Sequence, residues 1–306
     1  MLWSEIELQF LKINNKIQVN LYADEVQMIK CPYTRDKWIY IGLIAERLDN
    51  PLLDEIIKLR YINNFDKNSS YYKKNDRIIH WSDIDDAETM HIAQRWIEFI
   101  MKPENADKFY FYVLGINISK LDIGNFNKDD FFRSVYNRFF RSAILYLLKT
   151  AFPNNYIVVK DIFHEEGHQR EHKYFPWHPI LSIKEKEENI EFSCTQIKFL
   201  PKSHREDEGG DKRSNIIQLC DLLLGLCVGA LHGINKSSKR SKYRKPLMEM
   251  FLPFLQSMMD EPQKYKGRIM IRFFPKEKIT PNRLDNKDYN LFFTKRKIYY
   301  LEDFVK

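Results

Sequence analysis

The feature that most constrains the fold of this chain is an apolar stretch over residues 216–231, interrupted by Gln218 and Asp221. This stretch is shorter than the roughly 20 apolar residues that a bilayer span requires. We therefore predict a helix over residues 214–232 that is buried in a protein core rather than a membrane. Because an ionised carboxylate is costly in apolar surroundings unless it is paired or binds a metal, Asp221 is a candidate functional residue.

Alternating patterns before this helix indicate strands and helices in turn, which is typical of a sheet covered by helices. We predict an α/β fold with a core domain over residues 1–232 and an α+β extension over residues 233–306 that packs on it. The expected strands are 17–28, 37–46, 77–81, 108–119 and 156–163, with a second β-rich part at 174–200. The expected helices are 51–61, 85–101, 128–151 and 245–260, and the last strands are 268–274 and 291–300.

The composition is that of a globular protein, with 306 residues that are 44% hydrophobic and 30% charged. The 49 basic residues outnumber the 42 acidic ones, and this mild excess permits a polyanionic partner without requiring one. The four cysteines form no C-x-x-C pair, and residues 1–7 lack the pattern of a signal peptide. We therefore expect a cytoplasmic protein with no membrane segment; a protein partner or a homo-oligomer stays open.

Three aspartates occupy positions where they can meet at one edge of a sheet. Asp24 ends the first expected strand, Asp161 lies near the end of a later one, and Asp221 lies in the buried helix. Each acid alone is more often a cap or a structural ion pair. Together, carboxylates on separate elements are natural ligands for Mg²⁺ or Mn²⁺, and two such ions about 4 Å apart support phosphodiester cleavage.

Several short motifs resemble one bacterial family. The segment Tyr22-Ala-Asp-Glu25 resembles the N-terminal Tyr-x-Asp-Glu-Ser motif of domain-of-unknown-function family 3800. Residues 217–225 resemble the Leu-Gln-x-Ala-Asp-x-x-x-Gly helix of that family, and Ile79-His80 is similar to its Glu-Ile-His segment. Asp161 matches the middle acid of the family, so the resemblance covers about residues 16–232.

This resemblance implies a ribonuclease H-like core, a mixed sheet flanked by helices, that carries an acidic site. It implies Asp24, Asp161 and Asp221 as ligands of Mg²⁺ or Mn²⁺, with Glu25 and His80 as further catalytic residues near them. The expected function is that of a metal-dependent nuclease acting on DNA or RNA. Because a fourth acid is missing, a non-catalytic module that binds nucleic acid or a partner on the same fold is the alternative.

A competing pattern begins at His164. The segment His164-Glu165-Glu166-Gly167-His168 matches H-E-x-x-H, which on a helix would make a zinc metalloprotease, and His172 repeats the spacing. However, the match starts three residues after Asp161, where a strand is ending, and it has no apolar helical face. We expect a polar loop or exposed helix beside the acidic site. The alternative is that His164 or His168 assists the nuclease site as a proton donor or phosphate contact.

A basic segment follows the buried helix. Residues 236–245 contain six basic side chains, and phosphate contacts beside an acidic cleft are one use for them. The alternative is a solvated loop. The nucleic-acid-binding residues that we predict here are Lys239, Arg240, Lys242 and Arg244.

Overall fold

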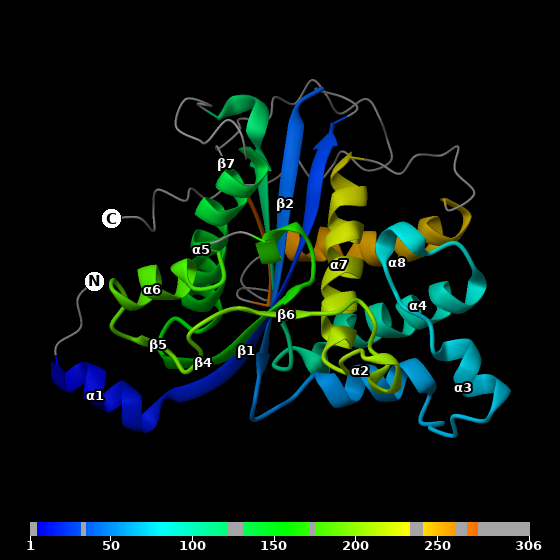
Figure 1. The fold of residues 1–306 in the computed structure, drawn as a ribbon, viewed down its shortest axis with the longest axis horizontal. Coiled ribbons are helices and arrows are strands. Elements are labelled where there is room, and N and C mark those ends of the chain that lie inside the picture. The colour runs from blue at the N-terminus through cyan, green and yellow to red at the C-terminus, as the bar shows by residue number, and fades with distance from the viewer. Residues whose placement is uncertain are drawn as a thin grey trace.

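The centre of the protein is a seven-stranded mixed sheet in the order β5-β4-β1-β2-β3-β7, with β6 also paired with β4. The computed structural model describes residues 5–31, 35–121, 131–171, 175–232, 241–260 and 268–274. Helices cover both faces of the sheet, so the predicted α/β fold with a mixed sheet flanked by helices is confirmed (Figure 1).

The strands divide into an antiparallel part and a parallel part. An antiparallel meander consists of β1 (Lys16–Lys30), β2 (Lys37–Arg47) and β3 (Tyr110–Asn117). Beside it β4 (Tyr156–Glu165) runs parallel to β1, and two short strands run parallel to β4, namely β5 (Ile190–Phe192) and β6 (Lys198–Leu200). At the other edge β7 (Ile269–Phe274) runs parallel to β3.

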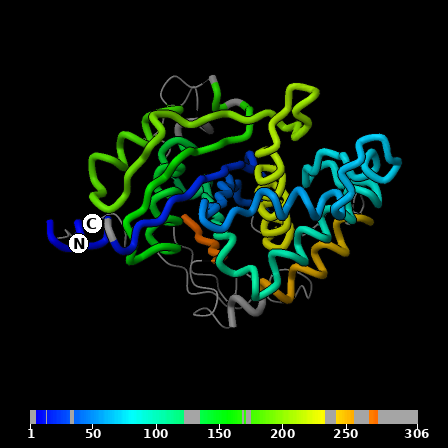
Figure 2. Tube along the Cα trace, turned by 90° about the horizontal axis from the view of Figure 1, so that it is seen from below, coloured from blue at the N-terminus to red at the C-terminus, as the bar shows by residue number. Residues whose placement is uncertain are grey.

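The two faces carry different helices. On one face α7 (Ser214–His232) lies against the sheet, between the strands and an outer group of helices, as the view from below shows (Figure 2). This outer group consists of α2 (Leu53–Tyr61), α3 (Ser70–Asn75), α4 (Ala87–Met101) and α8 (Ser241–Asp260). The opposite face is covered by α5 (Phe131–Ala151) and α6 (His178–Lys184), and α1 (Glu5–Asn14) precedes β1.

Buried apolar residues form a core on each face of the sheet, and the helix α7 lies at the centre of the larger one. It is long and apolar enough to cross a membrane by length and composition, yet 94% of its apolar window is buried inside the structure, as in the core helix of a soluble protein. The helix approaches the sheet closely at Gly42 of β2, because a Cβ there would lie 3.2 Å from the sulfur of Cys220. The sequence prediction of a buried helix at 214–232 is therefore confirmed.

Two segments differ in secondary structure from the sequence expectations, namely residues 77–80 and the expected β-rich part at 174–200, where His178–Lys184 form the helix α6. Residues 77–80 form an irregular segment that leads into a short 3-10 helix at Trp81–Asp83, and not a strand. The strand β7 pairs with β3 inside the main sheet, so the sheet continues across the expected boundary at residue 232. The expected strand over residues 291–300 lies outside the described residues.

Candidate functional site

The side-chain alternation of β1 and β4 decides which acids can meet. In a strand, neighbouring side chains point to opposite faces. Ala23 belongs to the core on the α5 side, so Asp24 points to the α7 side. Ala23 is paired with His164 in the parallel register, and the next position along both strands places Asp24 beside Glu165. The strand pairing therefore brings an acid that was not predicted as a ligand next to Asp24.

Three carboxyl groups gather on this face, and we call Asp24, Glu165 and Asp221 the acidic cluster. Burial raises the pKa of Asp24 well above its ordinary value, and the charges of Asp221 and Glu165 raise it further. Burial likewise raises the pKa of Asp221. Oδ2 of Asp24 is buried without a hydrogen-bond partner. The cluster thus brings three carboxyl groups together, and Asp24 is the most deeply buried of them.

The segment before α4 holds Asp221 and brings a histidine to it. The backbone N–H of Trp81 donates a hydrogen bond to Oδ2 of Asp221. Nε2 of His80 lies 3.7 Å from Oδ1 of the same carboxylate, and Nδ1 of His80 lies 2.6 Å from the hydroxyl of Ser82. The histidine charge opposes the rise in the pKa of Asp221. The predicted neighbourhood of His80 and Asp221 is therefore present in the structure.

A glycine on α7 explains part of the helical motif seen in the sequence. Gly225 lies about one turn after Asp221, and a Cβ at this position would overlap the ring of Trp81. The absence of a side chain lets Trp81 pack against the helix while its N–H reaches Asp221. The spacing from Asp221 to Gly225 therefore fixes the segment that carries His80.

Asp161 requires a correction. It lies four residues before Glu165 on the same face of β4, a separation of roughly 13 Å along a strand. Its carboxylate forms an ion pair with Nζ of Lys198 at 2.6 Å. The structure does not bring Asp161 to the acidic cluster, and Glu165 occupies the place that we predicted for it.

Glu25 also differs from its expected position, because it points to the α5 side of the sheet. There Oε2 of Glu25 lies 3.3 Å from Nε2 of His164, and the hydroxyl of Tyr136 lies 2.7 Å from the same nitrogen. Nδ1 of His164 lies 2.7 Å from the backbone oxygen of Glu165. Glu25 is close enough to influence the pKa of Asp24, but its carboxylate is paired with His164 on the other face.

The same geometry removes the arrangement that a zinc protease would need. His164 and Glu165 lie on the strand β4 rather than on a helix, and their side chains point to opposite faces of the sheet. His164 is fully buried among aromatic rings, with Tyr136 and Phe175 packed edge-on against it. The side chains of His168 and His172 lie outside the described residues.

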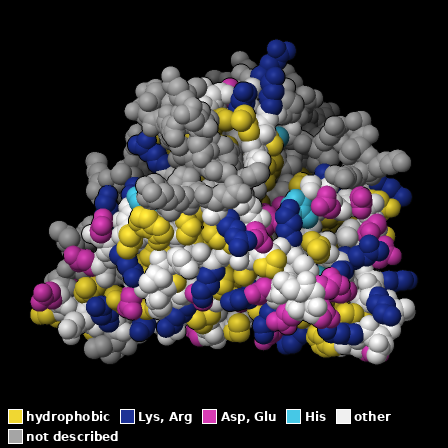
Figure 3. All heavy atoms as spheres, viewed as in Figure 1, with side chains coloured by type: hydrophobic (Ala, Val, Ile, Leu, Met, Phe, Trp, Pro, Cys, Tyr) yellow, Lys and Arg dark blue, Asp and Glu magenta, His cyan; other side chains and the backbone are white. Residues whose placement is uncertain are grey.

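Basic side chains flank the acidic cluster on two sides. Nζ of Lys202 lies 3.6 Å from Oε1 of Glu165, and the lysine side chain is 58% exposed. On the other side Arg244 lies over the ring of Trp81 at 5.4 Å and donates a hydrogen bond to the backbone oxygen of Ser82. In Figure 3, acidic, basic and histidine side chains lie next to one another right of the centre of this face.

The four basic residues predicted to bind nucleic acid lie in different surroundings or outside the described residues. Arg244 contacts the segment that carries His80, as described above. Lys242 is exposed, with its Nζ 5.2 Å from the ring centre of Tyr243. Lys239 and Arg240 lie outside the described residues. The structure therefore places one of the four next to the candidate site.

Sequence reasoning missed Glu165 as a member of the site. The usable signal was the period of two along β4, which places Asp161, Phe163 and Glu165 on the same face. Glu165 was considered only as part of the H-E-x-x-H pattern. Which of the two acids on this face meets Asp24 depends on the pairing of β1 with β4, and this is a tertiary property.

The acidic cluster offers only oxygen donors, which are the ligands that Mg²⁺ and Mn²⁺ prefer. The buried oxygen of Asp24 without a hydrogen-bond partner fits such a cation. Within the described ranges, no three His, Cys, Asp or Glu side chains already surround a common point as bound metal would require, so the carboxyls would have to adjust. No family model matches this chain, and the comparisons with curated proteins and with solved structures find no match either.

Proposed function

We propose that this protein is a metal-dependent nuclease that hydrolyses phosphodiester bonds of DNA or RNA at the acidic cluster. The observation that carries the proposal is the convergence of Asp24, Glu165 and Asp221 from two strands and a helix, with Asp24 buried and repelled by the other two. Neighbouring acids that raise the pKa of a buried carboxyl destabilise a fold, and such arrangements are concentrated at functional sites. A ribonuclease H-like core is compatible with the antiparallel meander and the parallel β4, and we keep the resemblance to family 3800 as part of the proposal.

The side chains at the acidic cluster would have separate roles in the reaction. Asp24, Glu165 and Asp221 would hold Mg²⁺ or Mn²⁺, and a bound ion of this kind supplies an activated water and stabilises charge on the phosphate oxygens. Asp24 would hold the ion as a carboxylate, so ion binding would oppose the rise in its pKa that burial causes. Lys202, at the edge of the cluster, is placed to contact a phosphate oxygen. The His80 side chain is a quarter exposed beside Asp221.

The direct test uses the full chain with short DNA and RNA substrates in Mn²⁺, Mg²⁺ or EDTA. Asp24→Asn, Glu165→Gln and Asp221→Asn each keep the size of the side chain and remove its charge. We expect each to reduce cleavage by about 100-fold or more, because loss of a ligand weakens both ion binding and charge stabilisation. The matched control is Asp161→Asn, which should stay within about threefold of the parent chain because it lies outside the cluster.

Two results would contradict this assignment. If the purified chain cleaves no nucleic acid in either metal, the nuclease proposal fails. If Asp161→Asn abolishes cleavage while Glu165→Gln retains it, the ligand set derived from the strand register is wrong.

A non-catalytic nucleic-acid-binding module is the second candidate. It is favoured by the ion pair between Lys202 and Glu165, which already neutralises one member of the acidic cluster without a metal. Calorimetry with Mn²⁺ separates the two candidates. Nucleic-acid binding that weakens steeply with salt, in the absence of divalent-ion binding, would favour the module, because phosphate contacts release counterions.

The remaining assignments concern the partner and the compartment. A nucleic acid is the proposed partner, in agreement with the net charge of +7. The four cysteines are free and buried, which is typical of proteins in a reducing compartment, and we therefore place the protein in the cytoplasm.

A further inference from the structure

The side chain of Gln218 connects the two flanks of the acidic cluster. Gln218 lies on α7 about one turn before Asp221 and is almost completely buried. Its Oε1 accepts hydrogen bonds from the backbone N–H of Ile79 at 3.0 Å and from Arg60 at 2.6 Å. Its Nε2 donates to the backbone oxygen of Lys202 at 2.8 Å and lies 3.3 Å from Nδ1 of His204. All four hydrogen-bonding positions of the amide are therefore used.

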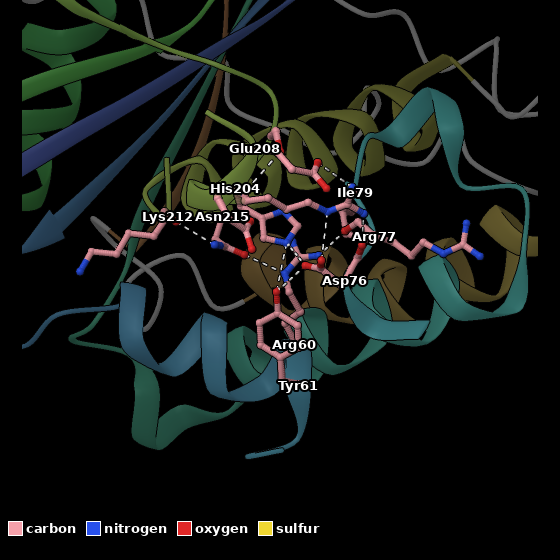
Figure 4. A network of polar contacts seen from close by, with 12 residues as sticks. Arg60, Tyr61, Asp76, Arg77, Ile79, His204, Glu208, Lys212 and Asn215 are labelled. Carbon is pink, nitrogen blue, oxygen red and sulfur yellow. Dashed lines mark hydrogen bonds and ion pairs between the residues drawn. The ribbon is translucent and has the colours of Figure 1, made fainter. Parts of the chain in front are cut away.

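A fully buried arginine completes one side of this network. Arg60 of α2 donates to Oδ1 of Asn215 at 2.8 Å and to the backbone oxygen of Arg77, and its guanidinium lies 4.8 Å from the ring centre of Trp96. Figure 4 shows Arg60 and Asn215 together with His204 and Asp76, in side chains that converge from separate parts of the chain. Because a buried guanidinium is costly unless its donors are satisfied, this network has little freedom to rearrange.

The histidine in the network fixes the orientation of the Gln218 amide. Nε2 of His204 lies 2.8 Å from Oδ1 of Asp76. Burial, with a contribution from the charge of Arg60, lowers the pKa of His204 to about 3, so the ring is neutral near pH 7. With Nε2–H donating to Asp76, Nδ1 is the acceptor for the Gln218 amide nitrogen. The carbonyl of Gln218 must then face Arg60 and Ile79.

We propose that Gln218 is a positioning residue that holds both flanks of the acidic cluster in register with Asp221. One flank is the segment 77–81, which presents His80 and the Trp81 N–H to Asp221. The other is the loop that begins at Lys202, whose side chain reaches Glu165. The catalytic part of this inference rests on the proposed nuclease function, whereas the structural part does not.

Asn215 provides a matched control on the same helix. It is buried, and Arg60 is its bonding partner too. Its side-chain amide donates to the backbone oxygen of Lys212, and no hydrogen bond in the described ranges links it to residues 77–81 or to Lys202. A loss that merely reflects a weaker core should appear in Asn215→Ala as well as in a Gln218 variant.

The experiment compares the full chain with Gln218→Met, Gln218→Glu and Asn215→Ala by amide hydrogen exchange and by steady-state cleavage in Mn²⁺. In Gln218→Met we expect exchange at Ile79 and Trp81 to speed up by about tenfold or more, because the bonds that hold this segment are lost. We expect kcat to fall about 10- to 100-fold with a small change in KM.

Gln218→Glu keeps an oxygen that accepts from Ile79 and Arg60, but it loses the amide N–H group that donates to the backbone oxygen of Lys202. It should preserve protection at Ile79 and raise KM more than it lowers kcat, because only the Lys202 flank is released. It also keeps the inference testable if Gln218→Met does not fold.

Unchanged protection at Ile79 and Trp81 in Gln218→Met would overturn the inference, and so would an equal loss in Asn215→Ala. If the parent chain shows no cleavage, the nuclease proposal fails while the exchange data still decide whether Gln218 positions the segment.

Discussion

The two faces of the strand pair β1 and β4 differ in how their charged residues are partnered. On the α7 face, Asp24 lies beside Glu165 and Asp221, and one of its buried oxygens has no hydrogen-bond partner. On the α5 face, the neighbouring residues Glu25 and His164 form a pair, and the hydroxyl of Tyr136 completes the arrangement.

This difference distinguishes the candidate functional site from a structural pair. A buried polar group without a partner costs free energy, whereas a hydrogen-bonded pair recovers most of the cost of burial. The Glu25–His164–Tyr136 group is therefore explained by folding alone. The acidic cluster is not explained by folding, because it weakens the fold, and this is why we assign it the chemistry.

The largest expected effect is that two neighbouring substitutions change the free energy of unfolding of the metal-free protein in opposite directions. Asp24→Asn should stabilise the fold by about 1–3 kcal/mol at pH 8, because it removes a buried charge that lacks a partner. Glu25→Gln should destabilise it by a similar amount, because His164 loses a paired carboxylate. Urea denaturation in EDTA measures both free energies of unfolding.

The stability gained by Asp24→Asn should depend on pH. The folded chain binds the Asp24 proton more tightly than the unfolded chain does, because the pKa of Asp24 is raised above its ordinary value of 3.8. This contribution to stability is present below pH 3.8 and is lost as the pH rises through the raised pKa. The gain from Asp24→Asn should therefore shrink as the pH falls from 8 towards 4. A gain that is constant with pH would show that the repulsion is not its cause.

A smaller effect is expected from Tyr136→Phe. The substitution removes a buried hydroxyl that lies 2.7 Å from Nε2 of His164, and we expect a loss of about 1–2 kcal/mol in the free energy of unfolding. Calorimetric titration with Mn²⁺ should be unchanged within about threefold, because the hydroxyl lies on the opposite face from the acidic cluster. A large loss of metal affinity would mean that the two faces are coupled and that our division of them is wrong.

The smallest effect is expected at Asp161, which lies on the α7 face but outside the acidic cluster. Its ion pair with Lys198 is partly exposed, with 49% of the lysine side chain accessible. Asp161→Asn should therefore change the free energy of unfolding by less than about 1 kcal/mol. The same denaturation series measures it, and a stabilisation as large as that of Asp24→Asn would place Asp161 with the repelling acids.

The amino-acid sequence alone determined much of the fold. The apolar stretch around Asp221 predicted α7 because only a buried helix satisfies an apolar segment of that length. The alternation of strands and helices predicted the class of fold, and the positions of Asp24 and Asp221 predicted two members of the acidic cluster. The segment 77–81 was expected as a strand, since the contacts that hold it come from Gln218 and Arg60, which are distant in the sequence.

Which acid of β4 joins Asp24 and Asp221 depends on the tertiary structure alone. Asp161 and Glu165 share one face of β4, and the periodicity of a strand cannot choose between them. The choice was made by the parallel register of β1 and β4, in which an irregularity shifts the pairing between Val19 and Asn20 by one residue. Such a register is set by core packing between segments more than a hundred residues apart, and not by the local residues of either strand.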